Sequence, residues 1–404
     1  MKAADSDTIA SVDFAVDYAS PLGRHTDIYH AENVNFWRDI IPEIVRDQIR
    51  SAEIEKPVRL HVRPGEGMPV YRRQHHLKIK RSQFGRHIAY GRALRPFYGR
   101  YYPKGLLKGV AGIFPQNIQP FRCLKVDDKT IEAELNHPLV DKQIQLQANV
   151  LQRGVKLEER GGASIDWIET IMNGSGMQAR INGKPTAFFD ENPFKRNDEK
   201  PDSEFYRQPR FVQHIDAKAD EIITSLHGRL LDPQMKVLDL MTSWVSHLPL
   251  DLQLEEAHGL GMNRAELAAN PMLTAYMVHD LNLKPFLPYP DSRFDAVLCS
   301  ASVEYLIRPF EIFKEVARVL RSEGLFITTF SNRWFPPKAV NIWQQIHEFE
   351  RMGLVMEYFA GSGEFTQLET LSVRGFPRPY EDKYFPQLRY ADPVYAVWGR
   401  KKSL

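Results

Sequence analysis

From Phe205 onward, short apolar segments alternate with helical ones, and this alternation constrains the fold more than any other feature of the sequence. Parallel strands joined by helical crossovers form a sheet that is covered on both faces. A helix is expected over 309–320, where apolar residues recur at helical spacing. The expected strands are 236–240, 256–260, 274–280, 294–299, 325–330, 368–373 and 394–399. The pattern predicts an α/β domain over 205–404.

The first half of the chain follows a different pattern. Because 404 residues exceed the length at which one core keeps growing, we expect further domains there. Residues 1–57 are predicted to be helical or irregular, with helical periodicity over 34–50. Residues 58–155 alternate apolar and polar positions, which predicts a β-rich module with strands at 58–62, 77–80, 121–126, 130–135 and 144–151. Residues 156–204 contain many turn formers and predict an extended connection.

The net charge of +2 hides an uneven distribution, because no Asp or Glu occurs between Glu66 and Asp127 while Lys and Arg are frequent there. A basic face over 67–126 indicates an acidic or polypeptide partner, a nucleic acid or an anionic membrane. Alternatively, the face docks on acidic parts of the same chain. We favour this second interpretation, and nucleic acid is not an expected partner.

Cysteine content and the N-terminal sequence bear on the compartment. The two cysteines, Cys123 and Cys299, form neither a disulfide framework nor a CxxC metal pair, which fits a reducing compartment and predicts no metal site. The N-terminal segment lacks the apolar stretch of a signal peptide, and no run approaches the length of a membrane span. A cytoplasmic protein is expected.

Four ordered blocks carry a resemblance to a known family. They are Val237-Leu-Asp-Leu240, Leu287-Pro-Tyr-Pro-Asp-Ser-Arg-Phe-Asp-Ala-Val297, Phe313-Lys-Glu-Val-Ala-Arg-Val-Leu-Arg-Ser-Glu-Gly-Leu325 and Asp392-Pro-Val-Tyr-Ala-Val-Trp-Gly-Arg400. In this order they resemble class I S-adenosylmethionine-dependent methyltransferases, specifically the methyltransferase type 11 group. The resemblance implies a Rossmann-like seven-stranded sheet and S-adenosyl-L-methionine as cofactor. It also implies in-line methyl transfer to a small-molecule acceptor through a thiol, hydroxyl or amine.

The loop after the first strand of this domain departs from the family. Where the family turns through Gly-x-Gly, this chain has Met241-Thr-Ser-Trp244, and the segment 259–263 lacks the acidic residue that grips the ribose. The acidic residues that organise the loop and meet the adenine amine are matched by Asp239 and Asp280. The resemblance implies a cofactor site formed by Asp239, Met241, Thr242, Ser243, Trp244, Asn263, Asp280, Leu281 and Cys299. Trp244 either walls this site or fills it.

Candidate acceptor-side residues flank the same edge of the predicted sheet. Tyr305 lies where many small-molecule methyltransferases have a His, and it can orient an acceptor or shuttle a proton, although a partly buried structural Tyr is more common. His214 is a candidate general base, for which the commoner alternative is a satisfied interior His. The expected acceptor-binding residues are Phe205, Tyr206, Arg210, Asn332 and Arg333.

Residues 97–151 resemble the insert domain and closing strand of SlyD-type FKBP prolyl isomerases, through Phe97-Tyr-Gly-Arg100 and Asn136-His-Pro-Leu139. The family's Asp-Gly-x-x-Phe-Asp segment, which lines the prolyl pocket, is not recognisable. The resemblance therefore implies a peptide-binding or packing module more than an isomerase. It leaves an alternative to the enzyme, namely a catalytically silent methyltransferase-like protein that binds a polypeptide or nucleic acid through its basic module.

Overall fold

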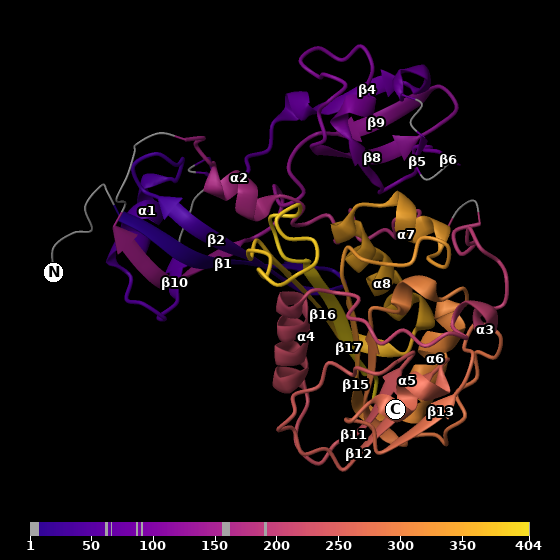
Figure 1. Cartoon of the computed structure of the whole chain (residues 1–404). Helices are drawn as coiled ribbons and strands as arrows, with labels where there is room; N and C mark the ends of the chain where they lie inside the picture. The colour runs from indigo at the N-terminus through magenta and orange to yellow at the C-terminus, as the bar shows by residue number, and fades with distance from the viewer. Residues whose placement is uncertain are drawn as a thin grey trace. The chain divides into compact units, whose positions relative to one another are not determined.

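The computed structural model describes residues 8–60, 64–65, 67–85, 88–89, 92–155, 162–189 and 192–403. The chain forms two compact units, whose elements are labelled in Figure 1. The first unit comprises Met1–Thr186, Leu371–Pro377 and Arg389–Ala391, and the second comprises Ala187–Thr370, Arg378–Leu388 and Asp392–Leu404. Arg86 and His87 of the basic stretch 67–126, called the basic window below, lie outside the described residues. Val62 of an expected strand and the start of the 156–204 connection do so as well.

The second unit contains strands in the order β13-β12-β11-β14-β15-β17-β16. Neighbours from β13 to β15 pair in parallel, and β17 is antiparallel to β15. The bounds are β11 (Lys236–Leu240), β12 (Glu256–Gly261), β13 (Ala275–Val278), β14 (Phe294–Ser300), β15 (Leu320–Phe330), β16 (Phe365–Arg374) and β17 (Val394–Lys401). This order confirms the predicted Rossmann-like methyltransferase fold with its antiparallel last strand.

The strand order reverses beside β11. β12 and β13 lie on one side of β11, whereas β14 and β15 lie on the other. Val237, Leu238 and Leu240 are fully buried, as expected for a central parallel strand with both faces covered. In open α/β sheets, ligands bind outside the carboxyl ends of the strands at such a reversal. The fold therefore directs attention to the residues that follow Leu240.

Helices cover both faces of the strands in the second unit. Figure 1 shows α4 (Ala217–Leu230) on one side of β15 and β17, with α6 (Pro309–Val319) and α8 (Glu348–Ser362) on the other. Phe313 of α6 packs against Phe326 of β15 and Phe359 of α8, with ring centroids 4.9 Å apart in both pairs. The remaining helices of the unit are α3 (Asp202–Phe205), α5 (Arg264–Ala269) and α7 (Asn341–Gln345).

The first unit begins with strands that the sequence analysis missed. β1 (Thr8–Ser20) and β2 (Gly23–Asn35) form an antiparallel pair, and β1 also pairs with β10 (Gln145–Val155), which pairs with β3 (Val58–Leu60). The prediction that 1–57 is helical or irregular is therefore wrong over β1 and β2, whereas a helix is present at α1 (Glu43–Ser51). Residues 58–155 do not form a module of their own, because β3 and β10 complete the sheet of β1.

The expected strands between residues 76 and 135 form a smaller sheet. Its order is β4-β9-β8-β7, with β4 (His76–Lys80), β9 (Thr130–Glu134), β8 (Pro120–Val126) and β7 (Tyr101–Pro103). A two-stranded sheet of β5 (Ile88–Ala89) and β6 (Arg92–Ala93) accompanies it, and α2 (Trp167–Met172) lies in the predicted connection. Phe121, Cys123 and Ile131 are fully buried between the strands. The small sheet therefore has its own core.

Two residues of the basic window are interior. Arg122 is buried and donates to the carbonyls of Gly99 and Ala179, at 2.8 and 2.7 Å, and Arg100 is also buried. The window is therefore not a uniform charged surface. No helix within the described part of the chain is long and apolar enough to cross a membrane.

A buried ion cluster ties the second unit together where α4 and β17 begin. Asp216 caps α4, and its backbone N–H donates to Asp392, whose backbone N–H donates to Asp216 in return. The Arg378 side chain, 2% exposed, lies 3.3 Å from Asp216, 2.7 Å from Asp392 and 3.0 Å from Asp382. The Arg378 guanidinium thus bridges two buried carboxylates that would otherwise repel each other, and Arg333 pairs with Asp392 as well.

Replacing Arg378 with Met keeps the approximate volume but leaves Asp216 and Asp392 without their shared cation. Removing one partner of a buried ion pair costs about 3–5 kcal/mol, so we expect a loss of unfolding free energy of that size in urea denaturation. Arg308→Met, at an exposed position on α6's N-cap, serves as the control. Equal stability of the two variants would contradict the role given to this cluster.

Candidate functional site

A cavity of 130 Å³ lies at the carboxyl ends of β11, β12 and β14. Three stretches of chain line it: the segment 206–215 before α4, the loop 241–247 after β11, and the ends of the neighbouring strands. The lining side chains include Asp202, Tyr206, Arg210, His214, Asp239, Met241, Thr242, Ser243, Trp244, His247, Asn263, Glu266, Asp280, Leu281, Ser300, Ser302, Tyr305 and Phe335. Most of the predicted cofactor residues are therefore brought together.

Asp239, the residue before the last of β11, carries a buried carboxyl group. Burial raises its pKa to about 6, although the hydroxyls of Thr242 and Ser246 lower it. Its Oδ2 atom has no hydrogen-bond partner among the described residues. The Oγ atom of Ser300 likewise has none. Buried polar atoms are rarely left unpaired in folded proteins. Both residues line the cavity, so these oxygens are candidates to meet a ligand.

The chain after β11 stays beside β12. The N–H of Thr242 donates to the carbonyl of Leu260 at 3.0 Å, which continues the parallel pairing of the two strands. A Cβ atom at Gly261 would lie 2.1 Å from the carbonyl oxygen of Thr242. The loop's main chain therefore fills the space beside 259–263, where the family carries its ribose acid. The two departures from the family pattern therefore meet at one contact, between Thr242 and Gly261.

The loop also makes its turns without glycine. Met241 and His247 adopt left-handed backbone conformations, with φ of 58° and 51°. Non-glycine residues in this region are uncommon and store strain that the surrounding contacts must offset. Trp244 is half-buried and packs edge-on against Phe211, with ring centroids 6.2 Å apart. Its indole therefore contributes a wall of the cavity together with the 206–215 segment.

Asp280 and Leu281 lie at the cavity, as the resemblance implies. Oδ1 of Asp280 accepts the backbone N–H groups of Asn282 and Leu283, at 3.0 and 3.1 Å. Asp280 thus caps the turn that follows it, and among the described residues none donates to its Oδ2. Asn263 is different, because its amide donates to the carbonyls of Tyr206 and Arg207 while its oxygen caps α5. All the hydrogen-bonding capacity of Asn263 is therefore used within the protein.

On the acceptor side, Arg210 organises an aromatic group. Its guanidinium lies 4.5 Å from the ring centroid of Phe205 and 5.8 Å from that of Tyr206. The hydroxyl of Tyr305 accepts the backbone N–H of Phe335 at 2.9 Å, and burial raises the Tyr305 pKa well above its usual value. Tyr305 therefore stays protonated at neutral pH, which suits positioning rather than proton abstraction.

The ring of His214 packs edge-on against Phe335, with centroids 5.1 Å apart. Desolvation, followed by the nearby charges of Arg210, Lys383 and His247, lowers the pKa of His214. The ring is thus favoured in its neutral form.

Four predicted site residues lie outside the cavity lining. Cys299 is fully buried, and burial raises its pKa well above the usual value, so Ser300 to Ser302 provide the wall instead. Phe205 packs behind the cavity against Phe335. Arg333 is paired with Asp392 and lies over the Tyr384 ring, and Asn332 accepts from Ser331. The structure therefore does not bring these four side chains to the cavity lining.

Glu266 and His247 line the cavity although neither was among the expected site residues. Glu266 of α5 lines the cavity and accepts the backbone N–H of Arg210 at 2.6 Å; partial burial raises its pKa. His247 lines the cavity and bonds Asp220 of α4. An acid five residues beyond the end of β12 could have been noticed as a substitute for the one missing at 259–263.

Glu304, next to Tyr305, is fully buried, and neither carboxyl oxygen has a partner among the described residues. Burial raises its pKa to about 8, although its own backbone N–H and the charge of Arg351 lower it. At neutral pH this carboxyl is therefore largely protonated. The described part of the chain contains no group of three His, Cys, Asp or Glu side chains placed to hold a metal ion.

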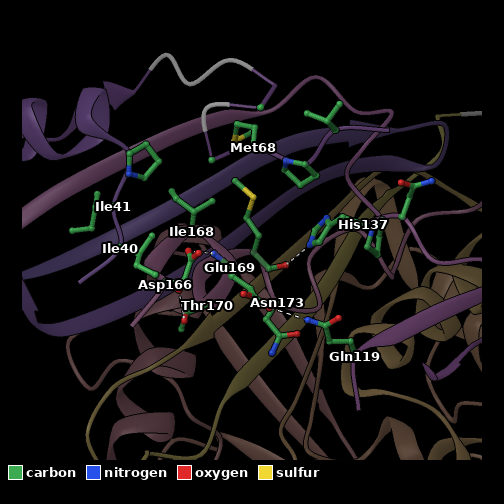
Figure 2. Close-up of a pocket in the computed structure, with 18 of the residues that line it drawn as sticks. Ile40, Ile41, Met68, Gln119, His137, Asp166, Ile168, Glu169, Thr170 and Asn173 are labelled. Atoms are coloured by element: carbon green, nitrogen blue, oxygen red, sulfur yellow. Dashed lines mark hydrogen bonds between the residues drawn. The ribbon is translucent and has the colours of Figure 1, made fainter. Parts of the chain in front are cut away.

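A separate and wider groove of 1620 Å³ lies within the first unit. Figure 2 shows Asp166, Glu169 and Thr170 of the α2 segment facing it, with Ile40, Ile41 and Met68 nearby. Gln119 donates to Glu169 at 2.9 Å, and His137 bonds the carbonyl of Met172 at 3.1 Å. These bonds connect the small sheet to α2 beside the groove.

Comparisons with known proteins agree with the fold of the second unit. Residues 256–328 match the family model described as a methyltransferase domain. This match supports S-adenosylmethionine as the cofactor. No curated protein matches the chain. Neither the family match nor the similar structures support the FKBP resemblance of residues 97–151.

Several solved structures are similar to this chain. A complex of the Haloferax volcanii Trm112 methyltransferase activator with a methyltransferase is 16% identical over 46% of this chain and 92% of that one, with a TM-score of 0.34. A methyltransferase from Thermotoga maritima is 14% identical over 46% and 91%, with a TM-score of 0.33. One from Mesorhizobium loti is 15% identical over 44% and 96%, with a TM-score of 0.30. Likenesses of this size do not reveal what this chain binds.

The packing of Thr242 against β12 predicts the effect of Gly261→Ala. The added Cβ would overlap the Thr242 carbonyl, so either the loop or β12 must shift, and we expect a loss of at least about 2 kcal/mol in urea denaturation. Gly154→Ala is the control, because its Cβ would meet only Ile9 at 3.4 Å. If Gly261→Ala is as stable as Gly154→Ala, the loop does not lie against β12.

The buried Glu304 predicts a pH dependence of stability. Because its pKa is raised from 4.5 to about 8 in the fold, the stability present below pH 4.5 is lost progressively as the pH rises to 8. Glu304→Gln should therefore gain stability over the wild type between pH 5 and 8, by up to about 4 kcal/mol. Calorimetric melting at pH 5.5 and 8.5 measures this, with the exposed Glu311→Gln as the control. Parallel pH curves for wild type and Glu304→Gln would refute a buried neutral acid.

Proposed function

We propose that the chain is an S-adenosylmethionine-dependent methyltransferase acting on a small-molecule acceptor, with the cavity at the carboxyl end of β11 as its active site. The observation that carries this proposal is the pair of buried oxygens without partners, Oδ2 of Asp239 and Oγ of Ser300, at the reversal of a methyltransferase-type sheet. A ligand bearing donors, such as the amino group of the cofactor's methionine moiety, would satisfy them.

The residues around the cavity fit the functional groups of the cofactor, but the cavity must widen to admit it. Asp239 and Ser300 would receive the methionine moiety, Asp280 and Leu281 the adenine, and Glu266 the ribose hydroxyls in place of the lost acid. Ligand pockets usually measure about 300–1,000 Å³, whereas this cavity measures 130 Å³. The loop 241–247 or the segment 206–215 must therefore open when the cofactor enters.

When bound, S-adenosylmethionine supplies an electrophilic methyl group that passes to a nucleophile in a single displacement. The protein's contribution is mainly alignment of the reacting atoms and exclusion of water. Trp244 and the 206–215 segment cover the cavity, while Tyr206, Tyr305 and Phe335 provide an acceptor wall. Arg210 holds this wall in place, because its guanidinium lies over the Phe335 ring and donates to the carbonyl of Phe205.

A second candidate function is a catalytically silent protein that binds a polypeptide. The small size of the proposed cofactor cavity and the groove of 1620 Å³ in the first unit favour this alternative. Ile40, Ile44, Val70 and Ile118 are exposed around this groove. Retention of a reduced, unfolded model polypeptide by the full chain, together with no cofactor binding, would support this alternative.

Isothermal titration of the full chain with S-adenosylmethionine and S-adenosylhomocysteine tests the proposal. We expect saturable heat for both ligands, and a roughly tenfold weaker affinity in Trp244→Ala, since a wall of the cavity is removed. Trp37→Ala, an exposed Trp of the first unit, is the control and should bind as the wild type does.

Two outcomes of this titration are informative beyond affinity. No heat at millimolar ligand would refute the methyltransferase proposal. Tighter binding by Trp244→Ala would show that the indole fills the cofactor's place rather than walling it.

A further inference from the structure

The altered loop brings a histidine with a carboxylate partner to the cavity. Nδ1 of His247 hydrogen-bonds Oδ1 of Asp220, which lies in the first turn of α4. A carboxylate only accepts hydrogen bonds, so Nδ1 carries the proton and the neutral ring presents the lone pair of Nε2. The His247 side chain lines the cavity and is 12% exposed. This is the arrangement of a base oriented by an acid.

The backbone of His247 is fixed independently of this pair. Its carbonyl accepts a hydrogen bond of 2.8 Å from Nδ1 of His227, which is fully buried on α4. Its φ of 51° places the residue in the left-handed region, where a non-glycine residue is strained. A strained conformation held by two contacts to one helix keeps the imidazole in one place. Such strain is frequent at functional sites.

Titratable groups face this imidazole from each neighbouring element. Asp220 and His227 lie on α4, His214 on the segment before it, and Asp239 at the end of β11. Among the described residues, no carboxylate bonds the ring of His214. His247 is therefore the better oriented of the two cavity histidines.

Four aromatic residues also line the cavity. Tyr206, Trp244, Tyr305 and Phe335 all line it, and the rings of Tyr305 and Phe335 stack with centroids 6.0 Å apart. Flat apolar faces of this kind suit a planar acceptor, because aromatic rings pack favourably edge-on or offset.

We propose that His247 is the general base of the reaction, positioned by Asp220, and that the acceptor is a phenol-type aromatic hydroxyl. The inference rests on the proposed function. The acceptor's O–H bond breaks, its electron pair stays on oxygen, and the proton moves to Nε2 of His247. After transfer, the imidazolium returns the proton to solvent. A thiol would need little such help, because it ionises readily near neutral pH.

Matched acceptors separate this role from a structural one. Phenol and thiophenol differ in the reacting atom, so loss of the base should slow methylation of phenol by about 100-fold or more while thiophenol changes less than about threefold. The variants are His247→Gln and Asp220→Asn. Glu221→Gln, at the next and exposed position of α4, is the control and should match the wild type with both acceptors.

A readout without cofactor accompanies these rates. In ¹⁵N-histidine spectra of the ligand-free chain, the neutral form of His247 should show a protonated Nδ1 and an unprotonated Nε2. Asp220→Asn should mix the two tautomers. An Nε2–H tautomer in the wild type would overturn the proposal.

The kinetic outcomes are equally decisive. Equal losses with phenol and thiophenol would assign His247 a structural role, and no loss with either would remove it from the reaction. Cofactor binding without methylation of phenol would overturn the acceptor class. Absence of cofactor binding would instead overturn the proposed function, while the spectra would still test the histidine and aspartate pair.

Discussion

The main chain of Thr242 lies against β12 at Gly261, and the organisation of the site follows from this contact. Because the Thr242 carbonyl fills the space that a side chain at residue 261 would need, the loop has no room for an acidic residue there. Because Thr242 extends the pairing of β11 with β12, the loop has no open glycine turn. Two apparent losses at the sequence level are therefore a single repacking.

This repacking relocates chemical groups without removing them. Glu266 brings a carboxylate to the cavity from α5, one turn beyond the usual place. The path of the loop carries His247 toward α4, where Asp220 and His227 hold it. Asn263, which resembles a substitute ligand in the sequence, instead ties the 206–207 backbone to α5. The segment 206–215 and the loop 241–247 are consequently both bonded near the carboxyl end of β12.

The sequence predicted the second unit better than the first. β11 begins and ends as expected, since a short, almost fully buried run bounded by a turn is typical of a central parallel strand. β1 was missed although Ala10, Val12, Phe14 and Val16 alternate inward. The polar residues between them left only short apolar pieces, with no helix or turn signal to mark the bounds of a strand. The sequence does not say which face of β14 the Cys299 side chain takes, and the structure places it outside the cavity lining. Glu266 was missed because an acid was expected only within 259–263, although its position shortly after β12 is visible in the sequence.

Hydrogen exchange of the full chain with and without S-adenosylmethionine tests the central claim, that the repacked loop holds the cofactor. Amide groups protected by a ligand exchange more slowly, in proportion to the stabilisation it provides. The account predicts slower exchange in the peptides covering 239–247 and 280–283 with the cofactor present. Unchanged exchange in both peptides at saturating cofactor would contradict it.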